Sequence, residues 1–261
     1  IMLKAGFDRG DALVAVGGGV IGDLGGFVAA AYMRGIDFYN LPTTLLAMVD
    51  SSVGGKVAVD LDGYKNIVGT FYQPRAVLAD PCVLQTLDAR QYACGMAEII
   101  KMFATSDAAM FARLEDRSAC ISREELICAA LRIKMAVVEA DEREGGLRRV
   151  LNFGHTVGHA VESISARQPY PLLHGECVSI GMLAMTDGEV RRRLTRLLHR
   201  YDLPTAFRCG RDDLCAVLAH DKKAGADGIT TVRVPEIGRF TLQKESTDDI
   251  LGSCGEVISF L

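Results

Sequence analysis

The sequence predicts an α/β domain built on a parallel β-sheet, followed by a mainly α-helical domain. Short apolar runs alternate with a helical pattern over residues 12–82, whereas from about Leu84 onward the apolar residues recur at helical spacing. The chain has 261 residues, of which 49% are hydrophobic and 24% charged, which is enough material for two domains. We expect the α/β domain at residues 1–83 and the helical domain at residues 84–261.

The elements of the first domain follow from local patterns. A strand is expected at residues 12–16, because A-L-V-A-V is a short apolar run that ends in a glycine turn. A helix is expected from about residue 22 to residue 33, and the runs at residues 36–42 and 76–79 are typical of buried parallel strands. Asp80-Pro81 is a turn signal that marks the exit from this sheet.

Helical periodicity dominates the second domain. Helices are expected at residues 90–111, 123–139, 151–165, 175–201 and 212–220, which have few β-branched runs. Near the end of the chain, G-I-T-T-V-R-V-P at residues 228–235 and R-F-T-L-Q-K at residues 239–244 predict a small strand pair.

Composition and charge exclude several classes of partner. The formal net charge is −4 and no basic tail is present, which argues against nucleic acid and against an anionic membrane surface. No uninterrupted apolar run reaches the ~18 residues that span a bilayer, and no signal peptide is visible. The eight cysteines contain no C-x-x-C pair, as is typical of thiols in a reducing compartment. We therefore expect a soluble, cytoplasmic protein.

A glycine turn, G-G-G-V-I-G-D at residues 17–23, follows the first strand and opens the first helix. It contains the spacing Gly17-x-Gly19-x-x-Gly22, in which glycines let the backbone approach a pyrophosphate and the helix N-terminus supplies N–H donors. The bare pattern is weak, but its place between a strand and a helix favours a nucleotide site in a Rossmann-like domain.

Two histidines are spaced four residues apart in R-R-V-L-N-F-G-H-T-V-G-H-A, residues 148–160. On a helix, His155 and His159 share one face, and Asn152 would lie close to the same stripe. Imidazole can bind a transition metal or transfer a proton near neutral pH, although such a pair can also form an ordinary polar helix face. The zinc-protease pattern is excluded, because Thr156 stands where that pattern needs a glutamate.

A carboxylate and a lysine lie within an apolar helical segment, G-M-A-E-I-I-K at residues 95–101. Glu98 and Lys101 are three residues apart, so they can form a surface ion pair or, because of their apolar flanks, Glu98 can be a metal ligand. One glutamate and two histidines would leave an open coordination position, as in catalytic metal sites.

Lys56 lies among Gly, Val and Ala in V-G-G-K-V-A-V-D. This context favours a desolvated lysine with an anionic partner, although a lysine that extends into solvent remains an alternative. Lys65 and Asn66 follow at a loop, where they offer a cation and an amide.

Motifs along most of the chain together resemble the 3-dehydroquinate synthase family of the sugar-phosphate cyclases. They run in order from about Asp11 to His220 and beyond: G-G-G-V-I-G-D, Y-M-R-G, P-T-T-L-L-A, V-D-S-S-V-G-G-K, K-N-I-V-G-T-F-Y-Q-P, A-E-I-I-K, L-N-F-G-H-T-V-G-H-A, L-H-G-E and H-D-K-K. The resemblance implies a dehydroquinate synthase-like fold, in which the Rossmann-like sheet precedes a helical, metal-binding domain.

The resemblance also implies roles for individual residues. The metal, Zn²⁺ with Co²⁺ as a substitute, would be held by Glu98, His155 and His174, while His159 would transfer a proton. Contacts to NAD match Gly18, Gly19, Val20, Ile21, Gly22, Asp23, Thr43, Thr44, Asp50, Lys56, Lys65 and Thr86. Contacts to a sugar phosphate substrate match Arg34, Lys56, Asn66, Lys101, Lys134, Arg148, Asn152, His159, Lys222 and Lys223. The family further implies a homodimer, in which Arg34 reaches across the interface.

The activity implied by the family is a step of the shikimate pathway. It converts 3-deoxy-D-arabino-heptulosonate 7-phosphate into 3-dehydroquinate and phosphate, through transient oxidation by NAD, phosphate elimination, re-reduction and an intramolecular aldol closure. A substrate with a carboxylate and a phosphate also gives a use to the lysines and arginines of an acidic chain.

Three alternatives remain open. A sibling cyclase would make a valiolone or deoxy-inosose ring, but Asn152 and His159 match the dehydroquinate type. A metal-dependent polyol dehydrogenase would give no reason for so many anion-binding lysines, and an inactive domain would serve assembly alone. The sequence also departs from the family, because members carry an earlier α/β portion before the glycine turn. Smaller departures are Met48 in place of the usual glutamine and D-L-D at residues 60–62.

Overall fold

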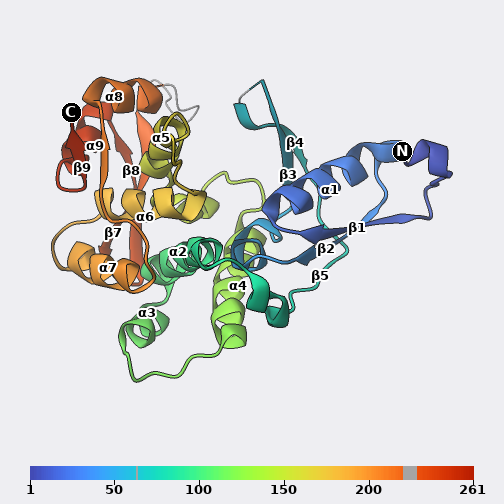
Figure 1. The fold of residues 1–261 in the computed structure, drawn as a ribbon, viewed down its shortest axis with the longest axis horizontal. Coiled ribbons are helices and arrows are strands. Elements are labelled where there is room, and N and C mark those ends of the chain that lie inside the picture. Colours follow the sequence, from blue (N-terminus) through green and yellow to red (C-terminus); the bar gives the residue numbers. More distant parts are fainter. Residues whose placement is uncertain (63, 220–227) are drawn as a thin grey trace. The chain divides into compact units, whose positions relative to one another are not determined.

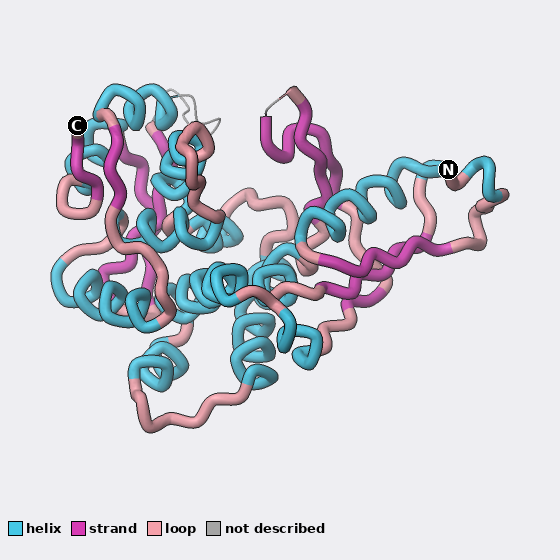
Figure 2. The backbone as a smooth tube through the Cα atoms, viewed as in Figure 1, coloured by secondary structure: helices cyan, strands magenta, loops and turns pink. Residues whose placement is uncertain are grey.

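The computed structural model describes residues 1–62, 64–219 and 228–261, which form two compact units, Ile1–Gly95 and Met96–Leu261. Figure 1 shows the order of the elements along the chain, and Figure 2 shows that helices dominate the second unit. The division between residues 83 and 84 stays a prediction; a 3₁₀ helix, η4 (Pro81–Thr86), occupies that position.

The first unit contains the expected parallel sheet. Its strands are β1 (Ala12–Gly17), β2 (Asp37–Pro42) and β5 (Ala76–Val77), in the order β1-β2-β5. β1 and β2 pair in parallel from Ala12 opposite Asp37 to Gly17 opposite Pro42, and β5 pairs with β2 over two residues. The three predicted strands and the α/β class are therefore confirmed.

Helix α1 (Gly19–Ala31) connects β1 to β2 and packs on the sheet. It begins at Gly19 rather than at the expected Gly22, and a short 3₁₀ helix, η2 (Tyr32–Arg34), follows it. Ala15, Ala29, Ile36 and Phe38 form the buried core of this layer.

The outer side of β1 is open in the described part of the chain. Val14 and Val16 are 53% and 59% exposed, and with Ile21 and Leu24 of α1 they line an apolar groove along the strand. Since β1 pairs only with β2 among the described strands, it forms an edge of the sheet.

An antiparallel hairpin that the sequence pattern did not reveal lies between β2 and β5 along the chain. Its strands are β3 (Lys56–Leu61) and β4 (Tyr64–Phe71), with a register shift between Val59 and Leu61. A single turn of π-helix, η3 (Ala47–Ser51), precedes the hairpin, and a 3₁₀ turn, η1 (Leu3–Ala5), lies near the start of the chain. Sequence analysis missed the strands because the region was interpreted only as a motif with polar site residues.

The second unit is mainly helical, as expected. Its helices, the first of which begins in the first unit, are α2 (Ala89–Ser106), α3 (Ala108–Glu115), α4 (Arg123–Ala140), η5 (Leu147–Asn152), α5 (His155–Ser165), α6 (His174–Ala184), α7 (Gly188–Arg200), α8 (Arg211–Ala219) and α9 (Thr247–Cys254). None of the helices within the described ranges is long and apolar enough to cross a membrane.

Three of the predicted helices are interrupted. Asp107 separates α2 from α3, because its carboxylate accepts the N–H of Met110 at 2.9 Å and caps a new helix. Gly154 separates η5 from α5 with a left-handed φ of 77°. The predicted helix at residues 175–201 divides into α6 and α7, and α7 begins at Gly188. Helical periodicity alone does not show such breaks, because it continues across them.

Two small sheets complete the second unit. The expected strand pair is confirmed as β7 (Ile229–Glu236) and β8 (Arg239–Glu245), which are antiparallel. A second pair, β6 (Phe207–Cys209) and β9 (Ile258–Phe260), is parallel and was not predicted.

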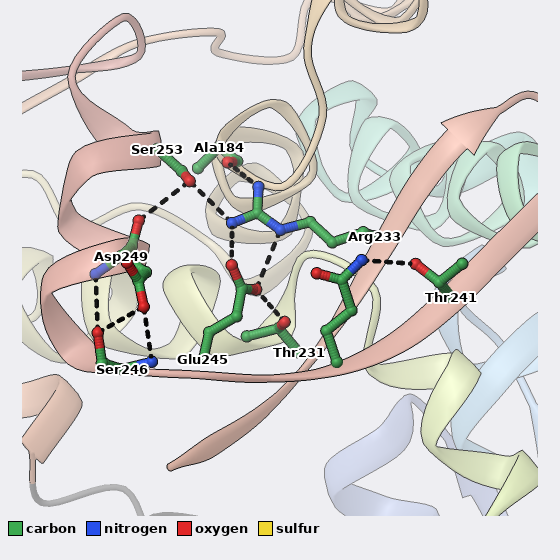
Figure 3. A network of polar contacts seen from close by, with 9 residues as sticks. Ala184, Thr231, Arg233, Thr241, Glu245, Ser246, Asp249 and Ser253 are labelled. Atoms are coloured by element: carbon green, nitrogen blue, oxygen red, sulfur yellow. Dashed lines mark hydrogen bonds and ion pairs between the residues drawn. The ribbon is translucent and has the colours of Figure 1, made fainter.

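A polar network joins the β7–β8 hairpin to α9 (Figure 3). Arg233 on β7 forms a 2.6 Å ion pair with Glu245 on β8 and donates to the hydroxyl of Ser253 on α9 at 2.8 Å. Thr231 donates to the same Glu245 carboxylate. The mostly buried charge pair thus joins β7 to β8, and the same Arg233 links both strands to α9 through Ser253.

Candidate metal and substrate site

Helix α2 carries two charged side chains into the interior of the protein. Glu98 is 0% exposed and Lys101 is 1% exposed, and they form an ion pair among fully buried neighbours such as Met96, Ile100 and Phe103. A surface ion pair is therefore excluded. Burying two charges is costly, so this pair needs further polar groups around it.

Helices α5 and α6 pack against each other so closely that glycine is required at their contact. A Cβ on Gly181 of α6 would overlap the carbonyl oxygen of Gly154 and lie 2.7 Å from the backbone nitrogen of Gly158. Gly154 also needs its left-handed φ to end η5 and start α5. With this close contact at Gly181 and the left-handed turn at Gly154, the first residues of α5 and α6, His155 and His174, have ring centroids 5.2 Å apart.

These two imidazoles meet the buried carboxylate of α2. Nε2 of His155 lies 3.9 Å from Oε1 of Glu98, and Nε2 of His174 lies 3.6 Å from the same oxygen. One ligand atom from each of the three residues lies within 4.8 Å of the other two. The structure therefore brings together Glu98, His155 and His174, which come from three separate helices.

The other nitrogen of each ring donates a hydrogen bond. Nδ1 of His155 lies 3.2 Å from the carbonyl oxygen of Phe153, and Nδ1 of His174 lies 3.3 Å from Oε2 of Glu162. Carbonyl and carboxylate oxygens only accept, so both Nδ1 atoms carry a hydrogen. In each ring, Nδ1 is therefore used by its hydrogen bond, and Nε2 is the nitrogen that lies near Glu98.

The pKa values of the two histidines shift in opposite directions. Burial lowers the pKa of His155 well below its ordinary value, and the charge of Lys101 acts in the same direction, so the ring stays neutral. For His174, loss of solvent also lowers the pKa, but hydrogen bonds to Glu162 and Glu98 outweigh it and raise the pKa to about 9. The two carboxylates thus favour positive charge at His174.

The three side chains fit a zinc ion by their chemistry. Zinc binds imidazole nitrogen and carboxylate oxygen, and catalytic zinc sites commonly have three protein ligands and one open position. Here a neutral imidazole, a second imidazole beside two carboxylates, and a fully buried glutamate converge. His159, Glu162 and His174 form a second group whose ligand atoms are equally close, and His159 is exposed.

His159 follows His155 by one turn of α5, as the sequence predicts. The rings of His155 and His159 have centroids 5.1 Å apart and nearly perpendicular planes, and the rings of His159 and His174 have centroids 5.9 Å apart. Asn152 does not continue this stripe, because Gly154 interrupts the helix and leaves Asn152 at the end of η5. The expectation of one continuous helical face is wrong at this residue.

Asn152 and Arg148 are held instead by the loop between α4 and η5. Asp141 accepts the backbone N–H groups of Gly145, Gly146 and Arg148 at 2.9, 2.7 and 3.0 Å. The N–H groups of Arg148 and Gly146 lower the pKa of the Asp141 carboxyl. From the end of η5, the side-chain amide of Asn152 donates to Glu144 in this loop.

Two further predicted cations of the second unit are buried. Arg148 is 3% exposed and donates to the carbonyl of Glu142, and Lys134 on α4 is 5% exposed. Because α4 packs against η5, Lys134 and Arg148 come from neighbouring elements. Lys222 and Lys223 lie outside the described residues.

The predicted nucleotide residues of the first unit gather partly around the glycine turn. Gly18 is the N-cap of α1 and has no side-chain cap. Its carbonyl accepts the N–H groups of Ile21 and Gly22, so the uncapped backbone N–H groups of the first turn are those of Gly19 and Val20, and Asp23 follows at the next position of the helix. The N–H of Thr43 donates to the carbonyl of Gly17 at 2.9 Å, and a Cβ on Gly18 would lie 3.1 Å from the methyl carbon of Thr44. Both threonines therefore lie beside the turn.

The remaining predicted residues of this unit lie on other elements. Asp50 belongs to η3, and the neighbouring Ser51 side chain would be 2.9 Å from a Cβ on Gly19. Thr86 ends η4, and Lys65 is exposed on β4.

The predicted substrate residues of the first unit are at the surface. Lys56 begins β3 and is exposed, so the expectation of a desolvated lysine is wrong for this structure. Asn66 has a left-handed φ of 51°, and its backbone N–H donates to Asp60 at 2.8 Å. Arg34 is exposed in η2 and also has a left-handed φ, 68°.

Comparison with known proteins gives a consistent result over most of the chain. The family model described as 3-dehydroquinate synthase N-terminal matches residues 1–94, and the model described as 3-dehydroquinate synthase C-terminal matches residues 95–224. The 3-dehydroquinate synthase of Latilactobacillus sakei is 45% identical over 251 residues, which are 92% of this chain and 70% of that protein. The chain belongs to the 3-dehydroquinate synthase family. The resemblance inferred from the motifs is therefore confirmed.

Solved structures of sugar-phosphate cyclases have the fold of this family member. The 2-epi-5-epi-valiolone synthase of Streptomyces hygroscopicus, with NAD⁺ and Zn²⁺ bound, has a TM-score of 0.86 at 28% identity, covering 97% of this chain and 75% of that one. A 2-deoxy-scyllo-inosose synthase complexed with carbaglucose-6-phosphate, NAD⁺ and Co²⁺ has a TM-score of 0.84 at 29% identity, covering 98% and 76%. The predicted dehydroquinate synthase-like fold is thus confirmed.

Sequence reasoning missed three residues that organise the site of this 3-dehydroquinate synthase family member. Glu162 hydrogen-bonds to His174, Asp141 holds the loop before η5, and Glu144 accepts from Asn152. A signal existed for Glu162, because it lies three residues after His159 and seven after His155, on the same face of a helix. No local pattern marked Asp141 or Glu144.

Proposed function

We propose that the protein converts 3-deoxy-D-arabino-heptulosonate 7-phosphate into 3-dehydroquinate and phosphate, as an NAD- and zinc-dependent carbon–oxygen lyase of the shikimate pathway. The observation that carries the proposal is the convergence of Glu98, His155 and His174 from three helices, beside the buried Lys101. The 45% identity to a 3-dehydroquinate synthase supports the choice of substrate.

The metal site and its neighbours divide the chemistry among them. Zinc held by Glu98, His155 and His174, with Co²⁺ as a substitute, would polarise a substrate hydroxyl, and NAD would take up a hydride and return it. His159 is exposed one turn after His155, where its imidazole can move a proton to or from the substrate. The net reaction eliminates phosphate and leaves the nucleotide unchanged.

The buried cations of the second unit would bind the two anionic groups of the substrate. Lys101, Lys134 and Arg148 are each at most 5% exposed, so their positive charges are poorly screened by water. Arg148 can bind a carboxylate or phosphate through two parallel N–H donors, and Asn152 can orient a hydroxyl. The loop held by Asp141 gives Arg148 and Asn152 their positions.

The first unit would bind the nucleotide. The start of α1, at Gly18, Gly19, Val20, Ile21, Gly22 and Asp23, would lie against a pyrophosphate, to which it offers the N–H groups of Gly19 and Val20 and the positive end of the helix dipole. Thr43 and Thr44 beside the turn, and Asp50 in η3, would add polar contacts. Lys56, Lys65 and Thr86 complete the proposed NAD set.

The remaining predicted assignments belong to the same proposal. Arg34, Lys56, Asn66, Lys222 and Lys223 would contact the substrate, with Arg34 acting across the interface of a homodimer. We further propose that the protein works in the cytoplasm, and that its functional division into nucleotide and metal domains lies near residue 84.

A sibling cyclase reaction is the second candidate, because both solved structures described above are sibling cyclases with high TM-scores. Their identities of 28% and 29% are well below the 45% shared with a 3-dehydroquinate synthase. The sibling enzymes share the fold, so the residues that contact the substrate decide between the two reactions. Asn152 and His159 are the positions that we expect to make this choice.

The decisive experiment supplies the purified protein with NAD, Zn²⁺ and either the heptulosonate phosphate or sedoheptulose 7-phosphate. We expect release of inorganic phosphate from the heptulosonate phosphate, with 3-dehydroquinate identified by mass spectrometry, and no NADH accumulation. His155→Ala serves as the control without a metal ligand. Preferred turnover of sedoheptulose 7-phosphate would establish the sibling reaction instead, and a protein that binds zinc and NAD but turns over neither sugar would contradict both.

A further inference from the structure

We propose that Glu162 is a positioning residue for the metal site, because its carboxylate holds the imidazole of His174 with Nε2 directed at Glu98. This inference rests on the proposed zinc-dependent function. Glu162 itself does not bind the ion; it accepts the Nδ1–H of His174 and thereby selects the nitrogen that acts as ligand.

The geometry around His174 supports this role. Oε2 of Glu162 lies 3.3 Å from Nδ1 of His174, while Nε2 of the same ring lies 3.6 Å from Oε1 of Glu98. The carboxylates of Glu162 and Glu98 therefore lie beside the two different nitrogens of the His174 imidazole. A ring nitrogen that donates a hydrogen cannot also bind a metal, so the contact with Glu162 leaves Nε2 as the ligand.

His174 depends on this contact more than His155 depends on its own. The side chain of His155 is only 10% exposed, and its Nδ1 donates to the carbonyl of Phe153, two residues away in the same segment. The side chain of His174 is 31% exposed, and its hydrogen-bond partner comes from another helix. Glu162 is 14% exposed, so water competes weakly for its carboxylate.

Helix α5 carries a metal ligand, the proposed proton-transfer group and the positioning carboxylate on one face. His155, His159 and Glu162 occupy positions i, i+4 and i+7 of the helix, so the ligand, the proposed proton-transfer group and the positioning carboxylate project in the same direction. The close glycine contact between α5 and α6 then places the start of α6, with His174, opposite this face.

A rival arrangement would use Glu162 as a ligand, together with His159 and His174. It would require the His174 ring to bind the metal through the side that now faces Glu162, and it would leave the fully buried Glu98 without a role in metal binding. Removal of His159 distinguishes the two arrangements, because His159 is a ligand in the rival set alone.

The test measures zinc affinity by competition with a chromogenic chelator, together with the visible absorption spectrum of the Co²⁺ form. We expect Glu162→Ala to weaken zinc binding about 10–100-fold and to alter the cobalt spectrum. Glu162→Gln keeps an oxygen acceptor and should recover most of the affinity. Glu139→Gln, at an exposed position of α4, is the matched control and should bind zinc as the unaltered chain does. Circular dichroism of the metal-free proteins checks that each variant is folded.

The outcomes separate this inference from the function on which it rests. Unchanged zinc affinity in Glu162→Ala would overturn the positioning role while leaving the proposed function intact. Equal losses of zinc in Glu162→Ala and His159→Ala would overturn it in favour of the rival ligand set. Failure of the unaltered chain to bind zinc would overturn the proposed function and the positioning role together.

Discussion

The two units build their candidate sites in opposite ways. In the second unit, charged side chains such as Glu98 and Lys101 are fully buried and held by helix packing. In the first unit, the candidate nucleotide site consists of backbone groups at the start of α1 and of polar residues such as Lys56 and Lys65, which are exposed. Function and stability are therefore coupled in the second unit and largely separate in the first.

The two units also differ in how their strands are covered. The open side of β1 exposes valines and lines an apolar groove, whereas the β7–β8 hairpin of the second unit is joined to α9 by the hydrogen bond from Arg233 to Ser253. Substitutions at the buried charges and at the α5–α6 contact of the second unit should therefore change folding and metal binding together. Substitutions at the glycine turn should change nucleotide affinity with little effect on zinc.

The largest expected effect is at the histidines of α5. His155→Ala should abolish zinc binding and turnover, whereas His159→Ala should keep zinc and lower kcat about 10²–10⁴-fold, because it removes the proposed proton-transfer group. Metal content by atomic absorption and steady-state kinetics check both. Thr44→Ala in the first unit is the comparison, with weaker NAD binding and normal zinc content. Loss of zinc from His159→Ala but not from His155→Ala would refute the assignment of roles.

The second largest expected effect is a loss of stability when the buried Glu98–Lys101 charge pair is broken. Glu98→Ala leaves the ammonium of Lys101 in the interior, and we expect a loss of about 3–5 kcal/mol in the free energy of unfolding of the metal-free protein. Urea denaturation in the presence of a chelator measures it. Asp37→Ala removes the exposed ion pair with Arg75 in the first unit and should change the stability very little, because solvent screens the two charges. Similar losses in both variants would remove the contrast between the units.

The close contact of α5 with α6 should tolerate no side chain. Gly181→Ala places a Cβ against the backbone of Gly154 and Gly158, and we expect a loss of about 3 kcal/mol in stability with weaker zinc binding, because the two histidines separate. Thermal unfolding and zinc titration measure the two effects. Gly252→Ala in α9 is the control, because a Cβ there meets nothing within 4 Å, and it should be neutral or slightly stabilising.

The smallest expected effect concerns the network of Figure 3. Burial alone would raise the pKa of Glu245, but hydrogen bonds from Arg233 and Thr231 outweigh it and lower the pKa. A carboxyl with a lowered folded-state pKa adds stability above its ordinary value of 4.5, and this contribution is lost as pH falls through the folded-state pKa.

Glu245→Gln should therefore lower the free energy of unfolding by roughly 1.5 kcal/mol at pH 7, and the difference from the unaltered chain should shrink below pH 4.5. Melting temperatures measured across this range check the trend. A difference that grows in acid would show that the Glu245 carboxylate does not stabilise the fold through this pair.

Most of the fold could be predicted from local patterns. The strands at β1, β2, β7 and β8 and the helix α4 were visible, because alternation, apolar runs and helical spacing are properties of short segments. The β6–β9 pair could not be recognised, since its short strands are far apart in the sequence, and the β3–β4 hairpin was missed because its polar residues were interpreted as site residues. The break at Gly154 was missed because the helical pattern continues through it.

The sequence by itself determined the order of the elements, the four-residue spacing of His155 and His159, the family membership, and the isolation of Glu98 within an apolar helix. These are properties of short segments or of residue order, so the amino-acid sequence alone is enough to recognise them. Only the tertiary structure decided that Glu98 is fully buried, that α5 and α6 approach at glycines, and that Glu162 orients His174. Distances between side chains on different helices depend on how the helices pack, and helix packing joins residues that are far apart in the sequence.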